Sequence, residues 1–454
     1  MALQSVNPAT GLVIESFEEH AFEQIGEILE SVETAFLSWR KVSLAERSAL
    51  MHRAAEILED RCDHLARTIT LEMGKAIKEA RAEVKKCAWV CEHYAQETAA
   101  ILSQETIEAG YLKSYVRFDP IGPVLAVMPW NFPFWQVFRF AAPALMAGNA
   151  GLLKHASNVM RCALEIEGIF RDAGFPDNLF RTLLVPSAPV AEIIANPVVR
   201  AVTLTGSELA GSQVAERAGK VLKKSVMELG GSDPFIVLAD ADLDRAATIG
   251  ASARLLNCGQ SCIAAKRFIV ECSVRDAFLQ RFVAAFQEMT VGDPLDEGTD
   301  VGPMARDDLL RELDDQVQKS IREGAEVQVG GRRLAQEGAF YAPTILSGVR
   351  PGMPAFDEEI FGPVAAVIDA DNVDHAVELA NSSAYGLGAS VWTEDREKAE
   401  EIAAQIESGA VFVNDMVKSD PRLPFGGVKQ SGYGRELSHY GIKEFVNIKT
   451  VVVQ

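Results

Sequence analysis

The sequence predicts an α/β fold of two or three domains, and three observations support this class. The chain has 454 residues, 48% of them hydrophobic, which is enough for a large buried core. After residue 119, short continuous apolar runs alternate with amphipathic stretches, and a second set of this kind follows nearer the C-terminus. Buried apolar strands separated by helices indicate parallel βαβ units, in which helices cover both faces of a sheet.

The first hundred residues are predicted to be helical. Residues 43–46, Ser-Leu-Ala-Glu, form a capping-box sequence that opens a run of apolar residues at helical spacing. A second helix, rich in Ala, Glu and Lys, is predicted over roughly 75–102. Cys87 and Cys91 lie four residues apart within it, so we interpret them as helix-packing residues rather than metal ligands.

The strands expected after residue 119 form two sets. The first comprises residues 123–128, 151–154, 181–185, 201–205, 225–229, 235–238 and 267–270. The second comprises residues near 364–368, 389–392 and 410–413. The tail over 444–454 ends in an apolar strand with nothing after it, which would leave an exposed edge. Pairing with a second subunit would cover that edge, so we expect a homodimer or a homotetramer.

The charge balance argues against some classes of function. There are 44 Lys and Arg against 64 Asp and Glu, a net charge of −20, and so acidic a surface repels nucleic acid. No stretch approaches the roughly 18 apolar residues of a membrane span. The first residues also lack the pattern of a secretory signal, so we expect a cytoplasmic protein. The seven cysteines form no metal-binding pattern, and we expect no metal.

Cys262 is the candidate nucleophile. It ends the segment 257–262, Asn-Cys-Gly-Gln-Ser-Cys, whose small and polar residues differ from the apolar surroundings of a packing cysteine. The segment alone is equally compatible with a structural cysteine. A catalytic thiol also needs a base and, when its target is a carbonyl, a group that stabilises the oxyanion.

Two other segments could supply those groups. Glu228 ends an apolar strand and is followed by Leu229 and two glycines. If Glu228 is buried, it should have a partner or a function, because buried carboxylates are otherwise rare. The alternative interpretation is that Glu228 is an acid in a surface turn. Asn131 stands just before Pro133, which suits the first turn of a helix. Its amide could therefore cap that helix or donate to a developing oxyanion.

Trp135 and Arg139 follow Asn131 at spacings of four and eight, which would place all three on one helix face. An arginine among aromatic residues is costly to bury without an anion. Trp135 could cover the guanidinium and leave it free to bind a substrate carboxylate. An ion pair with an Asp or Glu of the protein is an equally good interpretation.

The common phosphate-binding patterns are absent from the sequence. Residues 205–207, Thr-Gly-Ser, instead follow an apolar strand and precede a helical stretch. The N-terminus of a helix in this position can bind a pyrophosphate, although an ordinary turn between a strand and a helix has the same pattern.

Together these segments resemble the aldehyde dehydrogenase superfamily. Seven motifs occur in the order of that family and span most of the chain. They are residues 129–133 (Pro-Trp-Asn-Phe-Pro), Lys154, 205–207, 228–231 (Glu-Leu-Gly-Gly), 259–262 (Gly-Gln-Ser-Cys), 359–363 (Glu-Ile-Phe-Gly-Pro) and 424–427 (Pro-Phe-Gly-Gly). Within the superfamily, segments 130–139, 153–158 and 417–421 are similar to those of the short bacterial succinate-semialdehyde dehydrogenases.

The resemblance implies three structural parts. A Rossmann-type cofactor domain would comprise residues 1–103 and 121–229, and an α/β catalytic domain residues 230–430. A small β arm for oligomerisation would comprise residues 104–120 and 431–454.

The resemblance also implies the chemistry. Cys262 would attack an aldehyde, Asn131 and the backbone N–H of Cys262 would hold the oxyanion, and a nicotinamide would accept the hydride. Glu228 would activate the water that hydrolyses the acyl-cysteine. The implied cofactor-binding residues are Trp130, Lys154, Ser157, Gly206, Ser207, Glu228, Leu229, Glu359 and Phe361.

One position bears on the choice of cofactor. Many members of the family carry Glu three residues after the lysine, where it binds both ribose hydroxyls and repels a 2′-phosphate. This chain has Ser157 there, with Lys154 and His155 alongside. We therefore expect NADP to be preferred and NAD to be the poorer cofactor.

The implied substrate-binding residues are Trp135, Arg139, Ser419 and Phe425, with Arg139 and Ser419 as a carboxylate clamp. Succinate semialdehyde has both the aldehyde and the carboxylate that this arrangement needs. Three alternatives remain open. They are the same chemistry on glutarate semialdehyde or a neutral aliphatic aldehyde, a cysteine esterase that needs no cofactor, and a non-catalytic relative.

Overall fold

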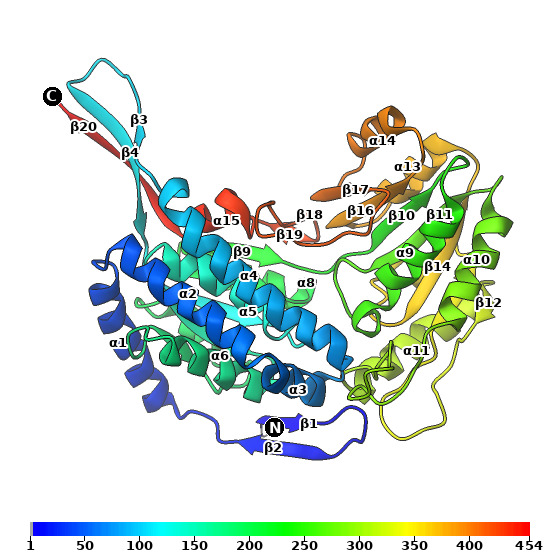
Figure 1. Cartoon of the computed structure of the whole chain (residues 1–454), viewed down its shortest axis with the longest axis horizontal. Helices are drawn as coiled ribbons and strands as arrows, with labels where there is room; N and C mark the ends of the chain where they lie inside the picture. Colours follow the sequence, from blue (N-terminus) through cyan, green and yellow to red (C-terminus); the bar gives the residue numbers. More distant parts are fainter. Residues whose placement is uncertain (1–2) are drawn as a thin grey trace.

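Two large sheets organise residues 3–454, which the computed structural model describes (Figure 1). The first has six strands in the order β19-β9-β8-β5-β6-β7, and the second has seven in the order β12-β13-β14-β11-β10-β16-β17. Each sheet has its own hydrophobic core. Most neighbouring strands are parallel, so the predicted α/β class is confirmed.

The N-terminal region begins with two short strands that were not predicted, β1 (Leu3–Val6) and β2 (Val13–Phe17). The predicted helices follow as α1 (Phe22–Trp39), α2 (Leu44–Asp60), α3 (Cys62–Met73) and α4 (Ile77–Ile101). The capping box is confirmed, because the Ser43 hydroxyl accepts from the Glu46 N–H and the Glu46 carboxylate accepts from the Ser43 N–H. Cys87 and Cys91 are fully buried on α4, as packing residues are expected to be.

The first sheet contains the predicted strands as β5 (Pro123–Met128), β6 (Ala150–His155), β7 (Phe180–Thr182), β8 (Ala201–Thr205) and β9 (Lys224–Glu228). Its helices are α5 (Trp135–Met146), α6 (Met160–Asp172), α7 (Val190–Ala195) and α8 (Glu208–Lys220). These five strands are parallel, and only β19 (Gly432–Tyr433) joins the sheet antiparallel, beside β9. The carboxyl ends of parallel strands share one edge, which is where open α/β sheets bind ligands.

The second sheet contains β10 (Asp233–Val237), β11 (Ala265–Glu271), β12 (Glu326–Val329), β13 (Thr344–Ser347), β14 (Val364–Ala370), β16 (Gly388–Trp392) and β17 (Ala410–Val413). Its helices are α9 (Leu243–Leu255), α10 (Arg275–Gln287), α11 (Asp307–Arg322), α12 (Pro354–Asp357), α13 (Val373–Asn381) and α14 (Arg396–Ala403). A separate two-stranded ladder joins β15 (Tyr385–Gly386) to β18 (Val428–Lys429). The chain passes from the first sheet to the second between β9 and β10.

A third sheet projects from the body of the molecule (Figure 1). In it β4 (Lys113–Pro120) lies between β3 (Glu105–Thr106) and the C-terminal strand β20 (Val446–Val453). Just before β20, α15 (Ser438–Glu444) packs against α5 of the first sheet. The division into domains at residues 103, 120, 229 and 430 stays a prediction. No helix within residues 3–454 is both long and apolar enough to cross a membrane.

Candidate active site

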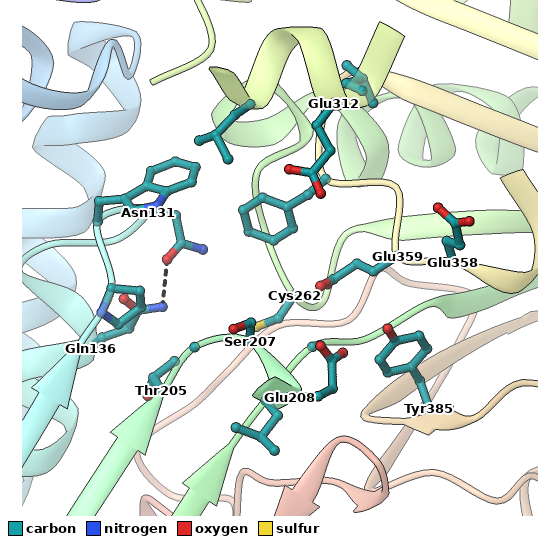
Figure 2. Close-up of a pocket in the computed structure, with 18 of the residues that line it drawn as sticks. Asn131, Gln136, Thr205, Ser207, Glu208, Cys262, Glu312, Glu358, Glu359 and Tyr385 are labelled. Atoms are coloured by element: carbon teal, nitrogen blue, oxygen red, sulfur yellow. Dashed lines mark hydrogen bonds between the residues drawn. The ribbon is translucent and has the colours of Figure 1, made fainter. Parts of the chain in front are cut away.

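Cys262 lies on the loop before β11, in the wall of two cavities. The first cavity, of about 390 Å³, lies between the carboxyl ends of β5, β8 and β9 and helix α11 (Figure 2). The second, of about 350 Å³, lies between α4, α5 and the segment 416–419. A thiol placed at this junction can meet one reactant from each side.

The first cavity contains six of the predicted cofactor-binding residues, namely Trp130, Gly206, Ser207, Leu229, Glu359 and Phe361. The rings of Trp130 and Phe361 meet edge to face with centroids 5.8 Å apart. Sequence reasoning missed the residues that complete the wall from other elements, Glu208, Leu309, Glu312, Leu313, Gln316, Glu358 and Tyr385. Most of them lie on α11 or on loops of the second sheet, and no local pattern marks them.

Lys154 lies near the end of the neighbouring strand β6, Ser157 follows that strand, and neither residue lines the first cavity. Lys154 is only 8% exposed, burial lowers its pKa, and within residues 3–454 no carboxylate lies within ion-pair distance of its ammonium. Ser157 is exposed two residues beyond the strand. A buried ammonium without an anion at the carboxyl edge of a parallel sheet fits an anionic cofactor.

The expectation that His155 stands beside a phosphate is wrong. Its ring is fully buried, with Nε2 2.9 Å from the carbonyl oxygen of Pro133, and Nδ1 accepts from the N–H of Ala156. Burial lowers its pKa to about 4, so the ring is neutral at pH 7. His155 therefore fixes the turn after β5 and offers no charge to a ligand.

The turn after β8 leads directly into the N-terminus of α8. Ser207 is the N-cap of α8, and its hydroxyl accepts from the N–H of Ala210 at 3.4 Å. Glu359 faces this turn across the cavity (Figure 2), and its carboxylate accepts from the N–H of Gly231 at 3.0 Å. A helix N-terminus, a carboxylate for hydroxyl groups and the buried Lys154 together fit a dinucleotide.

The helix after Asn131 begins later than predicted. α5 begins at Trp135 with Phe134 as its N-cap, so Pro133 and Asn131 precede the helix, and Asn131 does not cap it. Glu83 of α4 caps it instead, because its Oε1 accepts from the backbone N–H groups of Phe134 and Trp135, both at 2.9 Å. Trp135 and Arg139 remain four residues apart on one face of the helix.

The amide of Asn131 is oriented toward the nucleophile loop. Gln136 Nε2 donates to Asn131 Oδ1 at 3.0 Å (Figure 2), and Asn131 Nδ2 donates to the carbonyl oxygen of Gln260 at 3.0 Å. An amide nitrogen carries two hydrogens, so one N–H is left for another acceptor. The backbone N–H of Cys262 also donates to no group within residues 3–454. Each group thus keeps an N–H without an acceptor within the described residues, and Asn131 and Cys262 line the same cavity.

The loop that carries Cys262 is strained and tightly held. Asn257, Cys258 and Gly259 have successive φ angles of 55°, 55° and 70°, in the left-handed region. A Cβ at Gly259 would lie 2.2 Å from the carbonyl oxygen of Gly362, which explains why the loop needs glycine at position 259. Backbone strain of this kind persists where the surroundings fix it and is common at active sites.

Lys266 holds the other end of this loop. Its ammonium is buried, donates to the carbonyl oxygens of Ser261 and Cys262 at 2.8 Å each, and lies 3.5 Å from Glu359. Burial nevertheless raises the pKa of the Cys262 thiol to about 12, so the thiol is protonated at pH 7. It therefore needs a base to become a nucleophile.

Glu228 is buried at the end of β9 and lines neither cavity. Neither of its carboxylate oxygens has a hydrogen-bond partner within residues 3–454. Burial, together with the charge of Glu436, raises the pKa of Glu228 well above its usual value, and Arg139 opposes this effect. A raised pKa makes the ionised carboxylate a stronger base than usual, and the side chain lies outside both cavities that Cys262 lines.

The four predicted substrate residues, Trp135, Arg139, Ser419 and Phe425, all line the second cavity. Arg139 forms a buried ion pair with Glu436. Of the two interpretations of Arg139, the structure therefore has the ion pair with an acid of the protein. The guanidinium also lies 4.4 Å above the Phe425 ring. Lys86, which the sequence did not single out, lies in the same wall with its ammonium 2.8 Å from the Ser419 hydroxyl.

These features define a class of protein. A strained cysteine loop stands between a cavity at the carboxyl edge of a parallel sheet and a second cavity rich in cations, as in a nucleotide-dependent α/β enzyme with a cysteine nucleophile. The chain belongs to the aldehyde dehydrogenase family, whose sequence model matches residues 1–451. The resemblance seen in the sequence is thereby confirmed.

Several relatives are similar over almost the whole chain. A probable NADP(+) succinate-semialdehyde dehydrogenase of Synechocystis sp. is 51% identical, and the match covers 99% of each chain. The NADP(+) succinate-semialdehyde dehydrogenase 1 of Mycobacterium tuberculosis is 48% identical, again over 99% of each chain. The crystal structure of succinic semialdehyde dehydrogenase from Streptococcus pyogenes with NADP+ has a TM-score of 0.97 and 38% identity over 99% of each chain.

Proposed function

We propose that this chain oxidises succinate semialdehyde to succinate and reduces NADP, with NAD as a poorer cofactor. The observation that carries the proposal is the position of Cys262 in the wall of both cavities, where an aldehyde and a nicotinamide can meet at one sulfur. The names of relatives at about half identity over nearly full length support the choice of substrate and cofactor.

The residues of the chain divide the reaction between them. Glu228 takes the thiol proton, directly or through water, and the sulfur of Cys262 bonds to the aldehyde carbon. The free N–H of Asn131 and the backbone N–H of Cys262 hold the oxyanion, worth roughly 3–4 kcal/mol for each well-placed donor. When bound, the nicotinamide accepts a hydride from that carbon, which leaves an acyl-cysteine.

Hydrolysis then returns the enzyme to its starting state. Glu228 first releases the thiol proton to solvent and then takes a proton from water as the water oxygen bonds to the acyl carbon. The carbon–sulfur bond breaks, succinate leaves, and the Cys262 thiolate takes up the proton that Glu228 holds. Because the carboxylate lies outside both cavities, Glu228 must turn toward Cys262 or act through a water molecule.

A matrix of substrates and cofactors tests the proposal. Succinate semialdehyde, glutarate semialdehyde and butanal are each assayed with NADP and with NAD by the absorbance of the reduced nicotinamide, with Cys262→Ala as the blank. We expect the highest kcat/KM for succinate semialdehyde with NADP. Equal values for butanal, or acid formation without added cofactor, would contradict the proposal.

Ser157 is the proposed determinant of cofactor preference. A carboxylate at this exposed position would repel a 2′-phosphate, so Ser157→Glu should shift the ratio of kcat/KM for NADP over NAD toward NAD by about tenfold or more. Ser187→Glu adds the same charge at another exposed serine and should leave the ratio unchanged. An unchanged ratio in Ser157→Glu would refute this assignment.

Arg139 and Ser419 are the proposed carboxylate clamp. Arg139→Ala should raise KM for succinate semialdehyde and hardly affect butanal. Since this change alone leaves Glu436 as a buried charge without its partner, the double variant Arg139→Ala/Glu436→Gln is the better comparison. Equal losses on both aldehydes would contradict the clamp.

A further inference from the structure

The second cavity is lined by five cationic side chains, and four of them are already neutralised. Lys75 pairs with Glu83, Lys78 with Asp300, Arg139 with Glu436, and Lys418 with Asp415. Lys86 is the exception, because no carboxylate within residues 3–454 lies within 4 Å of its ammonium. The cavity therefore presents one cation whose charge is not compensated.

The surroundings of Lys86 are those of an anion site. Its ammonium donates to the Ser419 hydroxyl at 2.8 Å and lies 4.4 Å from the centroid of the Trp135 ring. The two nearby acids are engaged elsewhere, Glu83 with Lys75 and the N-terminus of α5, and Asp420 with Arg422. A half-buried ammonium beside a hydroxyl gains most from a carboxylate, which forms charge-assisted hydrogen bonds to both.

We propose that Lys86, together with the Ser419 hydroxyl, binds the carboxylate at the far end of the substrate. Lys86 and Cys262 line the same cavity, whose wall also includes the apolar side chains of Trp135, Ile263 and Phe425, which suit a short methylene chain. Arg139 would have to release Glu436 to bind the same group, whereas Lys86 needs no such exchange. The inference rests on the proposed function and adds Lys86 to the clamp of Arg139 and Ser419, as the cation that binds the carboxylate without breaking an ion pair.

The test compares two aldehydes of equal chain length that differ in the carboxylate. In Lys86→Met, KM for succinate semialdehyde should rise between about tenfold and a hundredfold, while kcat stays within a few-fold. The kinetics with butanal should not change, and Lys86→Arg should retain most of the affinity. Lys85→Met removes the exposed neighbouring lysine and should behave like wild type.

Succinate provides a readout that does not depend on turnover of the semialdehyde. In wild type it should inhibit butanal oxidation competitively, and in Lys86→Met its inhibition constant should rise by a similar factor. Lys86→Gln serves as a second variant in case the methionine disturbs folding. Equal losses on both aldehydes in both variants, or an unchanged KM for succinate semialdehyde, would overturn the inference.

The same data separate this inference from the proposed function. If wild type prefers succinate semialdehyde and Lys86→Met keeps that preference, only the role of Lys86 fails. If wild type shows no preference for succinate semialdehyde over butanal, the proposed function fails, and the role of Lys86 fails with it.

Discussion

At the scale of single residues, the buried charges around Glu228 determine when it can act as a base. Glu228 and Glu436 are both buried, and Arg139 and Arg435 are the cations that lower the pKa of Glu228. Two neighbouring carboxylates in a region of low dielectric resist simultaneous ionisation, so one of them holds its proton to higher pH. The activity should therefore depend on the ionisation of Glu228 at a pH above the usual range for a carboxyl group.

The first prediction concerns Glu436→Gln. Because a raised pKa keeps Glu228 protonated at low pH, kcat should fall as pH falls through that pKa. Removing the charge of Glu436 takes away a repulsion and frees Arg139, and both effects lower the pKa of Glu228. The acid limb of the pH profile of kcat should move to lower pH. Glu394→Gln, at an exposed position, is the control, and an acid limb that stays in place would contradict the coupling.

The second prediction concerns the ionisation of Lys86. Burial and the charge of Arg139 lower its pKa to about 8, although Glu83, Cys87 and Asp420 oppose this effect. A carboxylate binds the ammonium but not the neutral amine, so KM for succinate semialdehyde should rise as pH rises above about 8. Dividing this KM by the KM for butanal cancels the effect of other titrating groups that change both values alike. In Lys86→Arg the ratio should stay flat, and a flat ratio in wild type would refute the assignment.

At the scale of elements, the junction of α4 and α5 shows which contacts a sequence hides. Both helices were predicted, but the cap of α5 comes from Glu83, 51 residues before the Phe134 N–H that it accepts. Glu83 also pairs with Lys75 at almost no exposure. One carboxylate thus joins α4 to the helix that carries Trp135 and Arg139.

The third prediction follows from this junction. Glu83→Ala leaves a buried ammonium and two helix N–H groups without partners, which should cost about 3–5 kcal/mol. The midpoint of thermal unfolding should fall by at least about 5 °C. Glu97→Ala, at an exposed position on the same helix, should have little effect. Equal midpoints for the two variants would show that Glu83 does not hold the junction.

For several strands, by contrast, the local sequence pattern was sufficient to predict the bounds. β5 and β8 have the predicted bounds, because continuous apolar runs mark strands buried on both faces. β17 also has the predicted bounds, although its residues are only partly buried. The motifs at the carboxyl ends of β5, β8 and β9 meet because parallel strands end at one edge. The partners of these motifs do not follow from pattern. The ion pair of Arg139 with Glu436, the burial of His155 and the place of Lys86 in the cavity depend on contacts between distant segments.

At the scale of the whole molecule, the first two sheets have separate cores, and the third sheet extends away from both (Figure 1). Cys262 lies in the wall of both cavities. This third sheet has little to cover it. Its outer strand β20 pairs only with β4 within the described residues, and the arm exposes Ile107, Leu112, Ile448 and Val452. An open strand edge with exposed apolar side chains is costly for an isolated protomer and is a surface for association.

The fourth prediction is that this arm joins subunits into a homodimer or a homotetramer. Light scattering after size exclusion should give a mass that is a multiple of the 49.3 kDa protomer. Ile448→Asp, which places a charge at a side chain that is 60% exposed on β20, should shift the population toward the protomer, because the carboxylate would be desolvated in the contact. Leu222 lies away from the arm and is 95% exposed, so Leu222→Asp should leave the mass unchanged. A wild-type mass of one protomer, or the same mass change in both variants, would show that the open edge of β20 is covered in some other way.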